Sequence, residues 1–298
     1  MKSYSVHSID LPTGETLAYR QAGQGPAVVL IHGNMSSSVH WQTTIENLEP
    51  DFTVYAPDLR GFGDSTYNNR FDSLLELAQD VEAFLDALAV GPAALVGWST
   101  GGGVALEVAA SRPDQVTAIV LLDSVPPTGY PIFAKDATGA PILTQLLTTK
   151  EEIAADPVQV LPVLTAYATG DRAALRALWD AVIYNHHTPP EADYEAYLDA
   201  MLKQRNLVDI DYSLLMFNMT SAPSLSAPGS GRLDAVPGPV VVMNGEQDLV
   251  VPLAWAQQSL ALLGDRARLV TFPGSGHSPI TDEPAVFFAA LREALGGR

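Results

Sequence analysis

A serine between glycines is the residue whose type and setting most directly indicate covalent chemistry. Ser99 lies at the centre of residues 97–101, Gly-Trp-Ser-Thr-Gly, after the apolar run 93–96 and before the helix-like segment 104–108. A sharp turn from a strand into a helix holds such a serine in strained backbone geometry, and glycines on either side avoid side-chain clashes. The pattern predicts a nucleophile, and the Thr100 amide in the first helical turn is predicted to donate to an oxyanion.

A serine hydroxyl needs partners to act as a nucleophile at neutral pH. It requires a general base and a carboxylate that orients this base. Histidine is the side chain suited to take and return the proton, and the sequence contains six. His277 follows the last strand-like run of the chain, while the carboxylates Asp123 and Asp248 each follow an earlier one.

The elements that must position these residues alternate along the chain. Apolar runs are separated by helix-period segments, which is typical of a largely parallel sheet covered by helices. Residues 3–21 predict an antiparallel hairpin at the sheet edge, and apolar spacing of three and four predicts a helix over 74–88. Strands buried on both faces are predicted at 27–31, 53–56, 93–96, 117–122, 239–243 and 268–272.

An inserted region interrupts this alternation. Residues 125–237 contain no strand candidate and predict an all-helical cap between two segments of a core domain, 1–124 and 238–298. Helices of the cap are expected at 141–148, 157–168, 172–184, 191–204 and within 209–220.

Motifs throughout the predicted sheet resemble those of the α/β-hydrolase superfamily. Residues 32–34 are His-Gly-Asn, after the strand 27–31. Residues 58–65 match D-x-R-G-x-G-x-S, and residues 245–252 match G-x-x-D-x-x-V-P. Together with Gly-Trp-Ser-Thr-Gly, these motifs follow one another in the order of that superfamily. The resemblance implies an α/β-hydrolase fold, with a mostly parallel eight-stranded sheet flanked by helices.

The resemblance also implies roles for individual residues. His277 stands where the superfamily has its catalytic histidine, and Asp248 stands at the aspartate of the G-x-x-D-x-x-V-P motif. The chain order Ser, Asp, His is the one that this fold uses. Some members take the acid from the position of Asp123, which therefore remains the alternative acid. Asn34 is the position that donates the second oxyanion amide, beside Thr100.

The function that these expectations favour is a serine-dependent hydrolase of a small-to-medium hydrophobic carboxylic ester or lactone, acting through an acyl-enzyme intermediate. The alternatives are a hydrolase of carbon–carbon bonds, a cofactor-free oxygenase in which His277 pairs with Asp123, and a non-enzymatic ligand receptor. Side chains expected to contact the substrate are Met35, Trp98, Trp179, Tyr184 and Met216.

Composition narrows the class of partner. Of the 298 residues, 34 are acidic and 16 basic, and the formal net charge of −18 would repel a nucleic acid backbone. The sequence has no cysteine, no signal-peptide pattern and no apolar run long enough to span a membrane, so a soluble, cytoplasmic protein is expected. No metal or cofactor motif is present, and the oligomeric state is left open.

Overall fold

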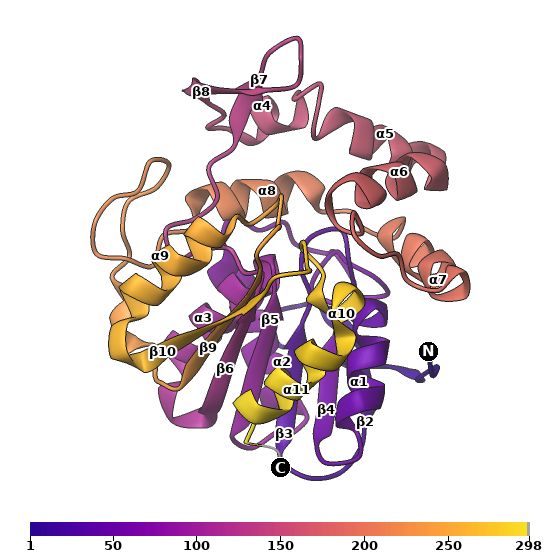
Figure 1. Ribbon diagram of the computed structural model, residues 1–298, viewed down its shortest axis with the longest axis vertical. Coiled ribbons are helices and arrows are strands. Elements are labelled where there is room, and N and C mark those ends of the chain that lie inside the picture. Colours follow the sequence, from indigo (N-terminus) through magenta and orange to yellow (C-terminus); the bar gives the residue numbers. More distant parts are fainter. Residues whose placement is uncertain (297–298) are drawn as a thin grey trace.

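An eight-stranded sheet forms the centre of the computed structural model, which describes residues 1–296 (Figure 1). The strand order is β1-β2-β4-β3-β5-β6-β9-β10, and pairing is antiparallel only for β1 with β2 and for β2 with β4. Residues 297 and 298 of the predicted core segment lie outside the described residues. The strands are β1 (Val6–Asp10), β2 (Thr16–Ala22), β3 (Ala27–Ile31), β4 (Thr53–Pro57), β5 (Ala93–Trp98), β6 (Val116–Leu122), β9 (Val240–Gly245) and β10 (Ala267–Phe272).

These strands confirm the sheet predicted from the apolar runs. β3 has the predicted bounds, and the other buried strands differ from theirs by one or two residues at an end. The amino-terminal hairpin is also confirmed, because β1 pairs antiparallel with β2 at the sheet edge. Such strands are easily predicted from the sequence, because a parallel strand that is covered on both faces consists of a continuous apolar run rich in β-branched residues.

Helices cover both faces of the sheet. In β3, Val28 and Leu30 belong to the apolar cluster under α1 and α11, whereas Val29 and Ile31 pack on the side of α2, α3 and α9. This alternation follows from the two-residue period of a strand. Within residues 1–296, none of the helices combines the length and apolar character needed to cross a membrane. The helices of this layer are α1 (Gln42–Leu48), α2 (Leu74–Ala87), α3 (Thr100–Ser111), α9 (Leu253–Leu263), α10 (Pro279–Asp282) and α11 (Pro284–Ala294).

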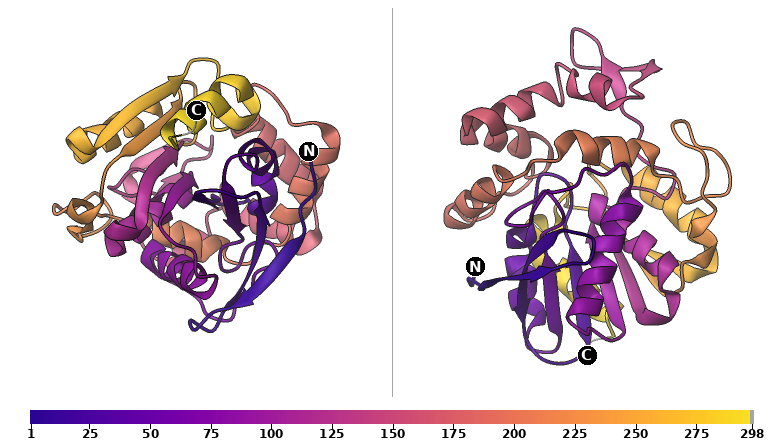
Figure 2. Two further views of the ribbon diagram at one scale, coloured as in Figure 1. Left: turned by 90° about the horizontal axis from the view of Figure 1, so that it is seen from below. Right: turned by 180° about the vertical axis from the view of Figure 1, so that it is seen from behind.

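Most of the chain between β6 and β9 lies above the sheet, as Figure 1 and the right view of Figure 2 show. Its division into a separate cap domain, 125–237, stays a prediction. The helices expected at 172–184 and 191–204 are present with shorter carboxyl ends. The elements of this region are β7 (Phe133–Lys135), β8 (Pro141–Leu146), α4 (Lys150–Ala154), α5 (Leu161–Thr169), α6 (Arg172–Val182), α7 (Glu191–Met201) and α8 (Leu207–Met216).

The prediction that this inserted region is all-helical is wrong at residues 133–146. The segment 141–148, predicted as a helix, instead begins with β8, which pairs antiparallel with β7. The turn between the two strands is closed by Asp136, whose Oδ1 accepts hydrogen bonds from the backbone N–H groups of Thr138 and Ala140 at 2.8 and 3.1 Å. This local turn chemistry specifies a hairpin, although the apolar residues of β8 have a spacing that also fits a helix.

Candidate active site

Ser99 occupies the whole turn between a strand and a helix. β5 ends one residue before it and α3 begins one residue after it. Its φ of 55° and ψ of −121° lie outside the regions that side-chain-bearing residues favour, at a cost of about 1–3 kcal/mol. A Cβ added at Gly97 would lie 2.3 Å from the Gly101 carbonyl oxygen, and one at Gly101 would lie 2.1 Å from that of Ile31. Both flanking positions therefore require glycine, which explains the motif around the serine.

His277 and Asp248 form a buried hydrogen-bonded pair. Nδ1 of His277 lies 2.7 Å from Oδ2 of Asp248, and the two side chains are 3% and 0% exposed. The second carboxylate oxygen, Oδ1, accepts the backbone N–H groups of Val250 and Val251 at 2.7 and 2.8 Å. In this arrangement Asp248 Oδ2 accepts a hydrogen bond from the N–H at Nδ1, which leaves Nε2 as the basic nitrogen of the ring.

Ser99 and His277 line the same cavity. No hydrogen bond joins the Ser99 hydroxyl to His277 within residues 1–296. A catalytic hydrogen bond of this kind is often long before substrate binds and shortens in the substrate complex. The arrangement therefore brings the predicted nucleophile and the predicted base to one surface, with Asp248 behind the base.

Asp123, the alternative acid, lies beside the His277–Asp248 pair but differs from Asp248 in its hydrogen bonds and in its pKa. Its Oδ1 accepts the backbone N–H of Gly245 at 2.9 Å, and its Oδ2 is buried without a hydrogen-bond partner among the described residues. Burial, and after it the charge of Asp248, raise the pKa of the Asp123 carboxyl well above its usual range. Burial and the neighbouring charge thus favour the neutral form of Asp123, and the carboxylate that contacts the imidazole belongs to Asp248.

The three side chains also have a spacing found in metal sites. One oxygen each of Asp123 and Asp248 and one nitrogen of His277 lie within 4.8 Å of one another. Zinc ligands lie about 2.1 Å from the metal, so two of them in tetrahedral geometry are about 3.4 Å apart. The 2.7 Å between His277 Nδ1 and Asp248 Oδ2 is shorter and is typical of a charge-assisted hydrogen bond.

The backbone around Ser99 offers two hydrogen-bond donors. Asn34 and Thr100 both line the cavity, and neither of their backbone N–H groups donates a hydrogen bond within residues 1–296. Thr100 is the first residue of α3, where backbone N–H groups lack helical acceptors and the helix dipole favours negative charge. Gly33 brings the Asn34 loop against Ser99, because an added Cβ there would lie 2.8 Å from the serine Cβ.

Side chains on both sides anchor the loop that carries Asn34. The fully buried His32 accepts the backbone N–H of Leu59 at its Nε2, at 2.9 Å, which agrees with a supporting role. The Asn34 side chain accepts a hydrogen bond from Gln204 Nε2 at 2.8 Å and donates one to Asp211 Oδ1 at 3.1 Å. The inserted region therefore holds the loop from above.

The cavity over Ser99 has a volume of about 510 Å³ and mostly apolar walls. Met35, Trp98 and Trp179, which were expected to contact the substrate, line it. Tyr184 and Met216, also expected there, are not part of the lining. Tyr184 is buried instead between Trp179 and Tyr194, with ring centroids 5.2 Å away from each.

The sequence prediction missed several lining residues, most importantly Asp211 in α8. Its side chain is buried, and burial raises the pKa of the Asp211 carboxyl to about 7. A signal was present, because Asp211 interrupts the otherwise mostly apolar residues of this helix. The other missed residues are mainly apolar and include Tyr130, Ile132, Val163, Leu178 and Leu207.

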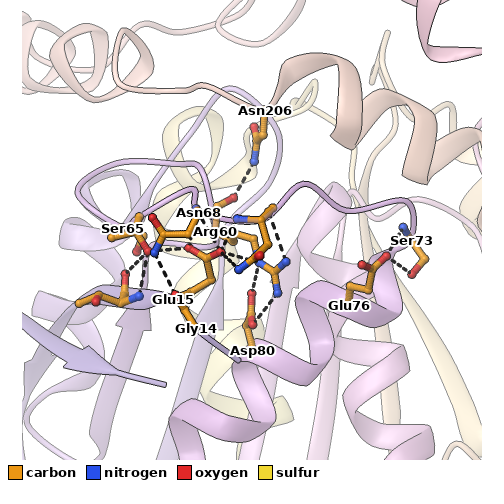
Figure 3. Close-up of polar contacts among 12 residues, drawn as sticks. Gly14, Glu15, Arg60, Ser65, Asn68, Ser73, Glu76, Asp80 and Asn206 are labelled. Carbon is orange, nitrogen blue, oxygen red and sulfur yellow. Dashed lines mark hydrogen bonds and ion pairs between the residues drawn. The ribbon is translucent and has the colours of Figure 1, made fainter. Parts of the chain in front are cut away.

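The loop 58–65, which matches D-x-R-G-x-G-x-S, is fixed by a buried arginine (Figure 3). Nε and Nη2 of Arg60 donate to the two carboxylate oxygens of Asp80 in α2, at 2.7 and 2.8 Å. The Arg60 carbonyl oxygen accepts a hydrogen bond from Nδ2 of Asn206, directly before α8, at 2.7 Å. The loop therefore connects a core helix to the helix that carries Asp211.

We expect Asp80→Asn to lower the free energy of unfolding by about 3 kcal/mol, because it leaves the buried Arg60 charge without its bidentate partner. Glu15, 3.9 Å from Arg60 Nε, compensates only partly. The melting temperature should fall by about 5–10 °C. Thermal and urea unfolding followed by circular dichroism measures both quantities.

Asp86→Asn is the matched control for this prediction. Asp86 lies in the same helix and also binds an arginine, Arg112, through both carboxylate oxygens, but its side chain is 60% exposed. Exposed pairs contribute about 0–1 kcal/mol. Equal losses in the two variants would contradict the structural role assigned to the Arg60–Asp80 pair.

Comparison with known proteins places this geometry in a family. A family model described as the alpha/beta hydrolase fold matches residues 26–284. This range includes Ser99, Asp248 and His277 and most of the eight-stranded sheet. The chain belongs to the α/β-hydrolase fold family.

Its relatives include proteins named as esterases. The chain is 31% identical over 278 residues to a pimeloyl-[acyl-carrier protein] methyl ester esterase of Nitrosomonas europaea, covering 90% of this chain and 95% of that one. It is 30% identical over 278 residues to the protein of the same name from Xylella fastidiosa, covering 92% of this chain and 96% of that one. Among solved structures, an esterase from Rhodococcus sp. ECU1013 has a TM-score of 0.71 at 25% identity, with 98% of both chains covered.

Proposed function

We propose that this protein is a serine-dependent hydrolase of small-to-medium hydrophobic carboxylic esters or lactones. Ser99 is the nucleophile, His277 the general base and Asp248 the acid that orients it. The observation that carries this proposal is the buried His277–Asp248 hydrogen bond on the wall of the apolar cavity that Ser99 also lines. The names of the relatives support the ester as the bond that is cleaved.

The reaction follows from the positions of these groups. Nε2 of His277 takes the Ser99 proton as the serine oxygen bonds to the ester carbonyl carbon. The backbone N–H groups of Asn34 and Thr100 stabilise the negative charge on the carbonyl oxygen. The imidazolium then protonates the departing alcohol oxygen, which leaves Ser99 acylated. A water molecule, deprotonated by the same nitrogen, releases the carboxylic acid and restores the serine.

The cavity favours an apolar substrate of limited size. Its volume of about 510 Å³ falls within the range of small-molecule sites, and aliphatic and aromatic side chains form most of its wall. The oxygenase alternative requires His277 to pair with Asp123. That alternative loses support because His277 bonds to Asp248, and burial together with the charge of Asp248 raises the pKa of Asp123.

The test is hydrolysis of a series of 4-nitrophenyl esters from acetate to octanoate, together with labelling by a fluorophosphonate that phosphorylates reactive serines. We expect turnover with a kcat on the order of 1–10³ s⁻¹ and an optimum at short to medium acyl chains. Mass spectrometry of the labelled protein should place the phosphonate on Ser99.

The proposal would be contradicted if the folded protein hydrolysed neither these esters nor a panel of lactones. Cleavage of vinylogous diketones in that case would support the carbon–carbon alternative. Tight ligand binding without turnover would support the receptor alternative. A phosphonate found on a serine other than Ser99 would overturn the assignment of the nucleophile.

A further inference from the structure

Asp211 places an unpartnered carboxyl oxygen in the candidate active site. The side chain is 6% exposed and lines the cavity together with Ser99. Its Oδ1 accepts a hydrogen bond from Asn34, whereas its Oδ2 accepts none within residues 1–296. This Oδ2 is not one of the fully enclosed oxygens that lack a partner, and Asp211 is part of the cavity wall.

Within residues 1–296, no lysine or arginine forms an ion pair with this carboxyl. Among the described residues, neither lysine nor arginine lines the cavity. Lys135 is near enough to influence Asp211, but its Nζ lies 3.6 Å from Asp156 Oδ2 and donates to the Phe133 carbonyl oxygen at 2.6 Å. Burying a carboxylate without a counter-charge is unfavourable, so a ligand that supplied the charge would be stabilised.

Three aromatic side chains of the otherwise apolar wall are compatible with a cationic group. Trp98, Trp179 and Tyr130 line the same space, and the faces of their rings attract positive charge. The formal net charge of −18 raises the local concentration of cations and lowers that of anions around the protein. A substrate carboxylate would find neither lysine nor arginine among the described lining residues and would be repelled by an ionised Asp211.

We propose that the substrates of this site are esters that carry a protonated amino group, which donates a hydrogen bond to Oδ2 of Asp211 while the ester carbonyl lies at Ser99. This substrate class rests on the ester hydrolase function proposed above. Asn34 connects the two ends, because its side chain binds Asp211 and its backbone N–H is an oxyanion donor. A substrate bound between them is held at its charged group and at its reacting carbonyl.

Asp211 also anchors the Asn34 loop, and this second role needs a separate readout. Anchoring requires only one oxygen acceptor, which the amide oxygen of an Asp211→Asn variant retains. Loss of anchoring would lower the rate on every ester by a similar factor. Loss of charge recognition would lower the rate on amino esters alone, so the ratio of the two rates distinguishes the roles.

The experiment compares matched esters that differ only in one terminal group. Ethyl esters of ω-amino acids are compared with ethyl alkanoates of equal length and with half-esters of dicarboxylic acids. A second set places the amino group on the alcohol, as in 3-aminopropyl acetate against butyl acetate. Measurements at about pH 8 keep the amines protonated, because the pKa of a lysine-like ammonium is about 10.4.

In the wild type we expect kcat/KM for the preferred amino ester to exceed that of its alkyl counterpart by about tenfold or more, and the half-ester to be the poorest substrate. In Asp211→Asn the ratio should fall to about one. Glu151→Gln removes one negative charge from an exposed position of α4 and should retain the preference.

Either of two results would overturn the inference. One is a wild type that hydrolyses the alkyl esters through Ser99 but shows no preference for the amino group in either set. The other is a preference that survives in Asp211→Asn. These results differ from the one that would contradict the proposed function, in which no ester of the panel is hydrolysed in a manner that depends on Ser99.

Discussion

Replacing Ser99 with alanine is expected to lower kcat for ester hydrolysis by about 10⁴-fold or more. The substitution removes the hydroxyl of the residue that forms the turn between β5 and α3 and lines the cavity with His277. Water attack assisted by the oxyanion donors of Asn34 and Thr100 would account for any residual rate. Steady-state hydrolysis of the best 4-nitrophenyl ester, at matched concentrations of wild type and variant, measures the ratio.

Ser278→Ala is the matched control for this substitution. Ser278 is buried beside the base in sequence, but its hydroxyl bonds to Thr281 at 3.1 Å and it is not part of the cavity lining. We expect its kcat to stay within about tenfold of the wild type. Circular dichroism should show that Ser99→Ala is folded, since the backbone hydrogen bonds of Ser99 are unchanged. Full activity of folded Ser99→Ala would disprove the assignment of Ser99 as the nucleophile.

Much of the sheet can be predicted because its signals are local. The run 27–31 specifies β3 by itself, since five apolar residues with β-branched members suit a strand covered on both faces. The turn at Ser99 can be predicted from the sequence for a similar reason, because the glycines that it requires lie two residues away on either side. His277 and Asp248 each follow a strand, so parallel strand ends bring them to the same edge of the sheet.

The inserted region is less predictable because its contacts are distant in sequence. β8 is mostly exposed, so its apolar residues carry no clear period of burial. Asp211 interrupts a mostly apolar helix, but its place at the site depends on a contact with Asn34, which is 177 positions away. Tyr184 was expected in the cavity because it is aromatic and lies in this region, yet its ring turns toward Tyr194. The sequence shows that aromatic residues occur in the inserted region, but it does not show which of them face the cavity.

Replacing Asp248 with asparagine is expected to lower kcat by about 10⁴-fold, because the substitution would reverse the proton positions on His277. The amide oxygen would remain where Oδ1 now accepts the N–H groups of Val250 and Val251. The amide nitrogen would then face Nδ1 as a donor. His277 would carry its proton on Nε2 and could not accept one from Ser99. Activity across pH measures the loss, which should persist at every pH where the wild type is active.

Asp123→Asn distinguishes Asp248 from the alternative acid. The raised pKa of Asp123 favours a neutral carboxyl, which is nearly isosteric with asparagine. The amide oxygen of asparagine can accept the N–H of Gly245 while its amide nitrogen donates toward Asp248. We therefore expect its kcat to remain within about tenfold of the wild type. A loss in Asp123→Asn as large as that in Asp248→Asn would show that Asp123 carries the negative charge that the imidazolium needs. The difference between these two isosteric variants, measured under the same conditions, thus identifies the carboxylate that is ionised beside His277.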